Sequence, residues 1–309
     1  MSDTTARVLY RYSEAANLKA RPPYFSKLLA LVSFARAVEA TAGRVRVTFV
    51  VDGPARAEVL AVMRSVGGLA RVSCGSNRAS YRAAVTMVGE AADDDTLTWF
   101  AEDDYLYHPD ALVALLAAAD AIPEADWFGL SGPTPPELLE MRRAQGPVTV
   151  PPLSRPGGVA VVQGEPWRRI DSTTSTFGGR TVVVRRDRRL LRAVPWSGAA
   201  WDRTTCLAVQ GITPYPWPHV LSDLVVDSTP KKRRAARIAW RVVTRGAVNL
   251  RACRAPGTRG LMVAPVTPLV GHMNLPFEER PEHWESMASQ TARWASDRGV
   301  RWGAAPGHA

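Results

Sequence analysis

The chain has 309 residues, of which 46% are hydrophobic and 22% charged, so it can bury a substantial core and wholesale disorder is not expected. The formal net charge is +10, and only four of the 39 basic residues are Lys, which predicts an anionic ligand or surface unless it reflects a compositional bias toward Arg. The three cysteines lie far apart and no apolar run reaches about 18 residues, so we expect a reducing, cytoplasmic location without a disulfide framework, a structural zinc site or a spanning helix.

Strand-like and helix-like runs alternate through the first half of the chain. The predicted strands cover residues 7–13, 45–51, 71–74, 96–101 and 126–130, and the predicted helices cover residues 24–42, 55–66, 81–92 and 110–121. This alternation is typical of a mostly parallel sheet covered by helices on both faces, so the sequence predicts an α/β fold.

The second half of the chain is less regular. Its predicted elements are, in order, a Pro-rich loop (134–163), a strand (181–185, TVVVR), a helix opened by Asp202 (201–209), a basic run (231–244), a closing helix (283–297) and a loose tail (303–309). The α/β prediction therefore depends mainly on the first half.

Several common functions of α/β proteins have sequence signatures that are absent from this chain. No G-x-G-x-x-G opens a helix, and no G-x-x-x-x-G-K-[ST] occurs. H-E-x-x-H and G-x-S-x-G are missing as well. These absences argue against a dinucleotide-binding domain, a P-loop NTPase, a zinc protease of that type and an α/β-hydrolase.

The strongest feature is a run of three acids, Glu102-Asp103-Asp104, directly after a buried-type strand. The carboxyl edge of a parallel sheet is where ligands bind in such folds. Clustered carboxylates repel one another and favour a bound cation, and Mg²⁺ or Mn²⁺ on oxygen ligands can bridge to a diphosphate. The alternative is a solvated acidic turn, which is how we interpret the acids at 93–95.

With this acidic run the chain resembles the GT-A fold glycosyltransferases, especially the broad family-two group of inverting enzymes. The resemblance rests on the Asp-x-Asp-like triplet after the fourth predicted strand and on the helix start Pro109-Asp110-Ala111-Leu112. The resemblance implies a GT-A type α/β domain, with a nucleotide-sugar-binding half (1–133) and an acceptor-binding half (134–302). It also implies transfer of a sugar from a nucleotide-diphosphate donor, with a divalent cation (Mn²⁺ or Mg²⁺) held by Glu102 and Asp104.

Two further matches lie downstream. Gly179 and a basic run to Arg186 precede Trp201-Asp202, where the family carries an acidic pair opening a helix. The resemblance thus implies Asp202 as the catalytic base, although Trp201 replaces the first acid and Asp202 could simply cap the helix. The family often completes the metal site with a His, for which His272 and His219 are the candidates; a lone His is more often structural or exposed.

The resemblance also assigns a donor site to the first half. Tyr12 and Ser13 would lie near the ribose, and Asp52 would bind the nucleobase unless Asp52-Gly53 is a plain turn. Asp103 would assist at the donor. Arg82, like the neighbouring Arg78, would reach the phosphates unless it is merely solvated. The hydroxyl-rich residues 171–177 could line an acceptor groove or form an ordinary loop.

Two other functions stay open. A nucleotidyltransferase shares this kind of sheet and metal site, but residues 11–21 lack the glycines of its usual loop. A nucleic-acid or membrane-surface binding protein is suggested by the net charge and by the basic run at 231–234. Trp240 is the only ring near that run, so no nucleic acid is expected. Peripheral membrane contact through 231–245 would suit a lipid-linked acceptor, although a saccharide or small-molecule acceptor and a solvated charged run remain alternatives.

Overall fold

A nine-stranded sheet forms the centre of the protein in the computed structural model, which describes residues 4–15, 20–88, 96–131, 150–197, 201–218, 231–253, 260–274 and 281–300, without the side chains of 231–238. The strand order is β3-β2-β1-β4-β9-β6-β10-β8-β7. These strands are β1 (Ala6–Ser13), β2 (Val45–Asp52), β3 (Gly68–Val72), β4 (Leu97–Glu102), β6 (Trp127–Gly129), β7 (Val159–Val162), β8 (Glu165–Arg169), β9 (Phe177–Arg180) and β10 (Met262–Pro265). A separate antiparallel pair joins β5 (Tyr105–Tyr107) to β11 (Val270–His272).

Within the large sheet, β3, β2, β1 and β4 are all paired in parallel, while β9 runs antiparallel to both of its neighbours, β4 and β6. β10 is parallel to β6, and β8 and β7 complete the sheet by antiparallel pairing. The sheet is therefore mixed but largely parallel.

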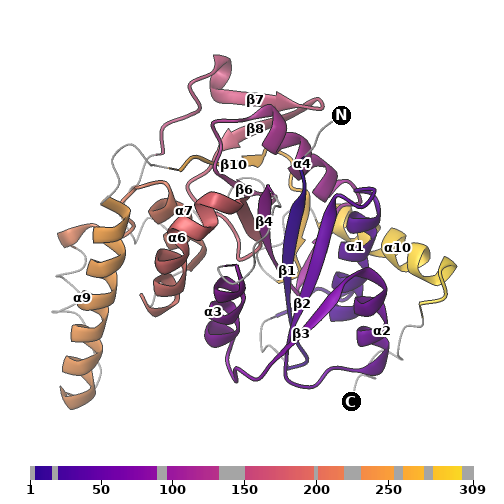
Figure 1. The fold of residues 1–309 in the computed structure, drawn as a ribbon, viewed down its shortest axis with the longest axis horizontal. Helices are drawn as coiled ribbons and strands as arrows, with labels where there is room; N and C mark the ends of the chain where they lie inside the picture. Colours follow the sequence, from indigo (N-terminus) through magenta and orange to yellow (C-terminus); the bar gives the residue numbers. More distant parts are fainter. Residues whose placement is uncertain are drawn as a thin grey trace.

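Helices cover both faces of this sheet (Figure 1). They are α1 (Lys27–Glu39), α2 (Ala57–Val66), α3 (Asn77–Met87), α4 (Ala111–Ala121), α6 (Thr181–Ala193), α7 (Trp201–Val209), α9 (Lys231–Cys253) and α10 (Pro281–Asp297), with short 3₁₀ turns η1 (Pro156–Gly158) and η2 (Val194–Trp196). Alternate β1 residues point to opposite cores: Val8 and Tyr10 pack in the cluster of α1, α2 and α4, and Leu9 packs in that of α3, α6 and α7. The α/β class predicted from the sequence is confirmed.

The prediction of a strand at 181–185 is wrong, because these residues begin helix α6. Thr181, Val183 and Val184 are buried together with Leu190 and Leu191, which is a helical spacing that continues beyond the five residues. β-Branched residues such as Val182, Val183 and Val184 favour strands, but packing of this segment against the sheet as a helix overrides that preference.

The strand of this region is β9, just before α6, and it has little side-chain bulk. A Cβ on Gly178 would lie 2.4 Å from the Thr98 carbonyl oxygen, and one on Gly179 would lie 2.7 Å from the Asp126 carbonyl oxygen. The two glycines thus let β9 fit between β4 and β6. The expected loop at 134–163 is also wrong in its described part, where η1 and β7 form, and β5, β8 and β10 were not predicted.

Candidate active site

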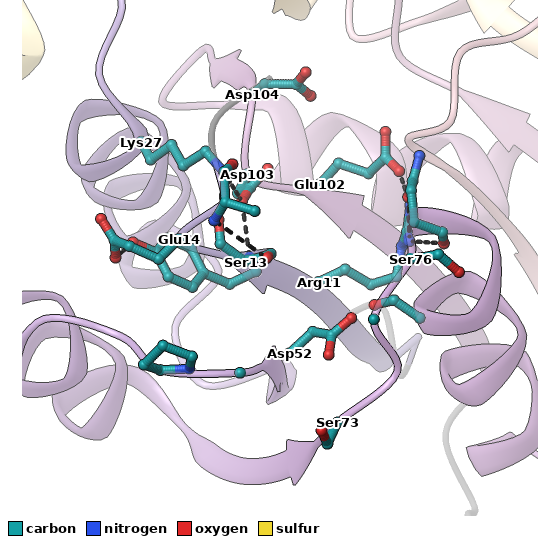
Figure 2. Close-up of a pocket in the computed structure, with 17 residues that line it drawn as sticks. Arg11, Ser13, Glu14, Lys27, Asp52, Ser73, Ser76, Glu102, Asp103 and Asp104 are labelled. Atoms are coloured by element: carbon teal, nitrogen blue, oxygen red, sulfur yellow. Dashed lines mark hydrogen bonds and ion pairs between the residues drawn. The ribbon is translucent and has the colours of Figure 1, made fainter. Parts of the chain in front are cut away.

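A cavity of about 980 Å³ opens where β1, β2 and β4 end (Figure 2). The parallel register places Ser13 opposite Asp52 and Arg11 opposite Glu102, so the polar strand ends meet at one edge of the sheet. The lining includes six residues that the sequence singled out: Tyr12, Ser13, Asp52, Glu102, Asp103 and Asp104. The volume is in the range typical of small-molecule sites.

Asp52 is held in place at the end of β2. Its Oδ1 accepts a hydrogen bond of 2.7 Å from the backbone N–H of Cys74, which follows β3. Gly53 next to it has φ +83°, the left-handed region that favours glycine. Asp52 and Gly53 therefore belong both to a turn and to the cavity lining, and the hydrogen bond from Cys74 holds the Asp52 carboxylate in place.

Asp103 is oriented by two elements on the α1 side of the cavity. Its Oδ2 accepts hydrogen bonds from the backbone N–H of Ser13 and from Lys27 Nζ, each at 3.0 Å. Burial raises the pKa of Asp103, the negative charge of Asp104 adds to the rise, and Lys27 opposes it. Lys27 also donates to the carbonyls of Ser13 and Ala15, so it ties the end of β1 to α1.

Asp104 meets His272 across the small sheet of β5 and β11. The register pairs His272 with Tyr105, and the Tyr105 and His272 rings stack at 4.6 Å. His272 Nε2 lies 3.2 Å from Asp104 Oδ2. The same oxygen accepts a hydrogen bond of 3.1 Å from Arg21 Nη2, so a buried carboxylate is shared by two nitrogen groups.

Glu102 takes no part in that pair. It forms an ion pair with Arg11, which also donates to the Asn77 side chain at 2.8 Å. Figure 2 shows Glu102 on the Arg11 side of the cavity, while Asp104 points away from Asp103 and Lys27. Within the described ranges no group of three His, Cys, Asp or Glu side chains is arranged to hold a metal ion, so the predicted set of Glu102, Asp104 and His272 does not assemble here.

Asp104 and His272 still fit a divalent cation as a pair, because a carboxylate oxygen and an imidazole nitrogen already converge at that point. The remaining positions would then be filled by oxygens of a bound phosphate group or of water. His219, the other candidate, lies outside the described residues.

Asp202 lies in the first turn of α7 and is not part of the cavity lining. Its Oδ1 accepts a hydrogen bond of 2.9 Å from Ser175 Oγ, within the hydroxyl-rich segment 171–177. Tyr105 hydrogen-bonds the Thr174 side chain and the Ser175 backbone; burial raises its pKa, and the charge of Asp202 and then that of Asp104 add to the rise. The charges of Asp202 and Asp104 therefore both raise the pKa of Tyr105, whose ring stacks on His272.

Arg82 is placed differently from the expectation. Its guanidinium lies over the Trp196 ring at 5.4 Å, and Arg78 lies over the same ring at 4.6 Å. Neither arginine is among the residues that line the cavity. This placement gives no support to a phosphate-binding role for Arg82.

Three basic residues at the site were missed by sequence reasoning: Arg11, Lys27 and Arg21. Arg11 had a usable signal, since it is a charged residue inside an apolar strand, and burial lowers its pKa. Lys27 is one of only four lysines in the chain. Arg21 carried no signal, because its place beside Asp104 depends on a loop path that the pattern does not encode.

No protein-family model matches the sequence, and no curated protein is detectably similar to it. Solved structures that it matches include the GT-A glycosyltransferase LgtC in complex with donor and acceptor sugar analogues (13% identity, TM-score 0.42, 96% of this chain and 100% of that chain). They also include TarS of S. aureus, at 10% identity and TM-score 0.40, where the match covers 77% of this chain but only 43% of the TarS chain.

A nucleotidyltransferase is matched as well: CMP:2-keto-3-deoxy-manno-octonic acid synthetase complexed with CTP, at 13% identity and TM-score 0.40 over 94% of this chain and 100% of that chain. With TM-scores below 0.5 and such low identities, these likenesses carry no functional argument.

Proposed function

We propose that this protein is a glycosyltransferase that moves a sugar from a nucleotide-diphosphate donor to an acceptor hydroxyl, with the help of a divalent cation and with inversion at the sugar carbon. The observation that carries the proposal is the cavity at the ends of β1, β2 and β4, which gathers Asp52, Asp103 and Asp104 with the cations Arg11 and Lys27. Acids for a metal and a nucleobase, beside cations for phosphates, suit a nucleotide diphosphate.

The residues divide into a donor side and an acceptor side. Asp52 would bind the nucleobase, and Tyr12 and Ser13 would lie along the ribose. Asp103, held by Ser13 and Lys27, keeps the end of β1 fixed under the donor. Asp104 and His272 would hold the cation, which supplies positive charge to the departing diphosphate.

Asp202 is proposed as the general base on the acceptor side. Its carboxylate would take the proton of the acceptor hydroxyl as that oxygen bonds to the sugar carbon and the diphosphate leaves with the electrons of the broken bond. The hydrogen bond from Ser175 orients the carboxylate, and the neighbouring hydroxyls of 171–177 would bind the acceptor. The acceptor itself would be a saccharide, a lipid-linked molecule or a small molecule.

Calorimetric titration with a panel of nucleoside diphosphates and nucleotide sugars, in Mn²⁺ and in chelator, tests this proposal. We expect at least one sugar nucleotide to bind, and to bind more tightly in Mn²⁺. Asp104→Asn should remove the Mn²⁺ effect, whereas Asp297→Asn, an exposed Asp at the end of α10, should leave it unchanged. Equal affinity in Mn²⁺ and chelator would refute the metal site. Turnover of a nucleoside triphosphate with release of pyrophosphate would instead identify a nucleotidyltransferase.

A further inference from the structure

Large exposed apolar side chains gather at helix α9. Trp240 is 53% exposed, Val243 64% and Leu250 50%, and Trp217, 48% exposed, packs next to Gly246 of the same helix. In an α-helix, positions 240, 243 and 250 lie along one stripe. Figure 1 shows α9 as the outermost element on its side of the sheet.

The opposite side of α9 is firmly packed, which fixes the direction of the stripe. Val248 and Asn249 are fully buried, and Asn249 exchanges hydrogen bonds with the backbone of Tyr215 at 2.6 and 3.2 Å. Arg245 donates to the Ser197 carbonyl at 3.1 Å. The Trp240 and Trp196 rings pack edge to face with their centroids 5.8 Å apart, and about half of the Trp240 side chain stays exposed. The stripe is therefore a prearranged surface of the fold.

The charge of α9 indicates what would cover this stripe. The helix sequence, KKRRAARIAWRVVTRGAVNLRAC, has eight Lys and Arg and no Asp or Glu, in a chain of net charge +10. Exposed Trp with aliphatic neighbours, flanked by basic residues, is the composition of helices that lie in the interface of an anionic bilayer. No described helix is long and apolar enough to cross a membrane, so the contact would be peripheral.

From this stripe and its charge we infer that α9 docks the protein onto an anionic lipid surface. Trp240, Val243 and Leu250 would enter the headgroup region, and the basic residues of the helix other than Arg245, which bonds to the packed side, would bind lipid phosphates. Nucleic acid fits the stripe less well, because exposed Val and Leu side chains have neither a charge nor a hydrogen-bond donor for a phosphate backbone. The inference is independent of the sugar-transfer proposal and stands or falls on vesicle binding alone.

Co-sedimentation of the full chain with vesicles provides the test. We expect binding to vesicles of phosphatidylcholine with about 30% phosphatidylserine, and at least roughly tenfold weaker binding to pure phosphatidylcholine, with loss at high salt. The double variant Val243→Ser/Leu250→Ser should weaken binding by about tenfold, because two apolar side chains no longer enter the interface. Circular dichroism verifies that the variant is folded.

The matched control is Val161→Ser/Val182→Ser, which alters two valines on β7 and α6 that are at least as exposed as Val243 and Leu250. This control should bind vesicles like the unaltered chain. Equal loss in both double variants, or binding that does not depend on anionic lipid, would overturn the inference. It would also be overturned by light scattering that shows a dimer broken by Val243→Ser/Leu250→Ser, since a second copy would then cover the stripe, or by binding to duplex DNA without binding to vesicles.

Discussion

Arg21 is the residue whose replacement should reveal most about the proposed cation site. Its Nη2 lies 3.1 Å from Asp104 Oδ2, the oxygen that also faces His272. Its Nη1 donates to the Met273 carbonyl at 2.5 Å, and its guanidinium lies over Phe25 at 4.2 Å. A divalent cation that uses this oxygen must displace Arg21, so Arg21→Ala should increase the affinity for the cation.

The size of the increase follows from the strength of the contact. The Arg21 and Asp104 side chains are only 12% and 9% exposed, so solvent screens their interaction little. A hydrogen bond between charged groups contributes about 1.5–3 kcal/mol, and each 1.4 kcal/mol corresponds to about tenfold in affinity. We therefore expect Arg21→Ala to bind Mn²⁺ roughly tenfold to a hundredfold more tightly.

Electron paramagnetic resonance of free Mn²⁺, without nucleotide, measures this affinity independently of activity. The matched control is Arg298→Ala, because Arg298 also pairs with a carboxylate, Glu39 at 3.0 Å, and also lies over a ring, Trp294 at 4.1 Å, but on α10 and the following turn. The control should bind Mn²⁺ like the unaltered chain. A folded Arg21→Ala protein with unchanged or weaker Mn²⁺ binding would show that the cation does not compete for Asp104.

Three further predictions address single carboxylates. Asp52→Ala should raise the dissociation constant of the donor by roughly tenfold, the loss of about one charged hydrogen bond, and unchanged donor binding in calorimetry would remove Asp52 from the nucleobase site. Asp202→Asn should lower kcat by roughly 10²-fold or more with little change in donor affinity or melting temperature, whereas near-normal turnover would place the base elsewhere. Because the pKa of Asp103 is raised, its ionised form is disfavoured in the folded state, so the free energy of unfolding should fall as pH rises from the ordinary Asp pKa through the raised one. Urea unfolding at several pH values should show a smaller fall for Asp103→Asn than for the unaltered chain. Equal pH dependence in the two proteins would contradict the raised pKa of Asp103.

The first half of the fold could be predicted from the sequence because its signals are local. The periodicities that place β1, β2 and β4 and helices α1 and α4 are properties of short windows, and the structure confirms these elements. The clustering of Ser13, Asp52 and Asp103 at one edge then follows from parallel pairing alone. What the strand ends bind is a separate question and stays a prediction.

The second half could not be predicted in the same way because its structure depends on contacts distant in sequence. Residues 181–185 have the composition of a strand, yet they form a helix because the neighbouring Phe177–Arg180 already fills the gap between β4 and β6. Only the close approach of Gly178 and Gly179 to those strands makes this arrangement possible, and such an approach is visible only once the sheet order is known.

The small sheet of β5 and β11 shows how the fold could join the two sides of the proposed reaction. It brings together Asp104 and His272, which are 168 positions apart, and it stacks Tyr105 on the His272 ring. The Tyr105 hydroxyl is hydrogen-bonded to the Thr174 side chain and to the Ser175 backbone. The Ser175 hydroxyl in turn donates a hydrogen bond to Asp202 Oδ1. One buried ring thus lies between the proposed cation ligands and the proposed base. The short motif Glu102-Asp103-Asp104 predicts a cation site, whereas the contact of Tyr105 with both sides arises from the strand that follows the motif directly.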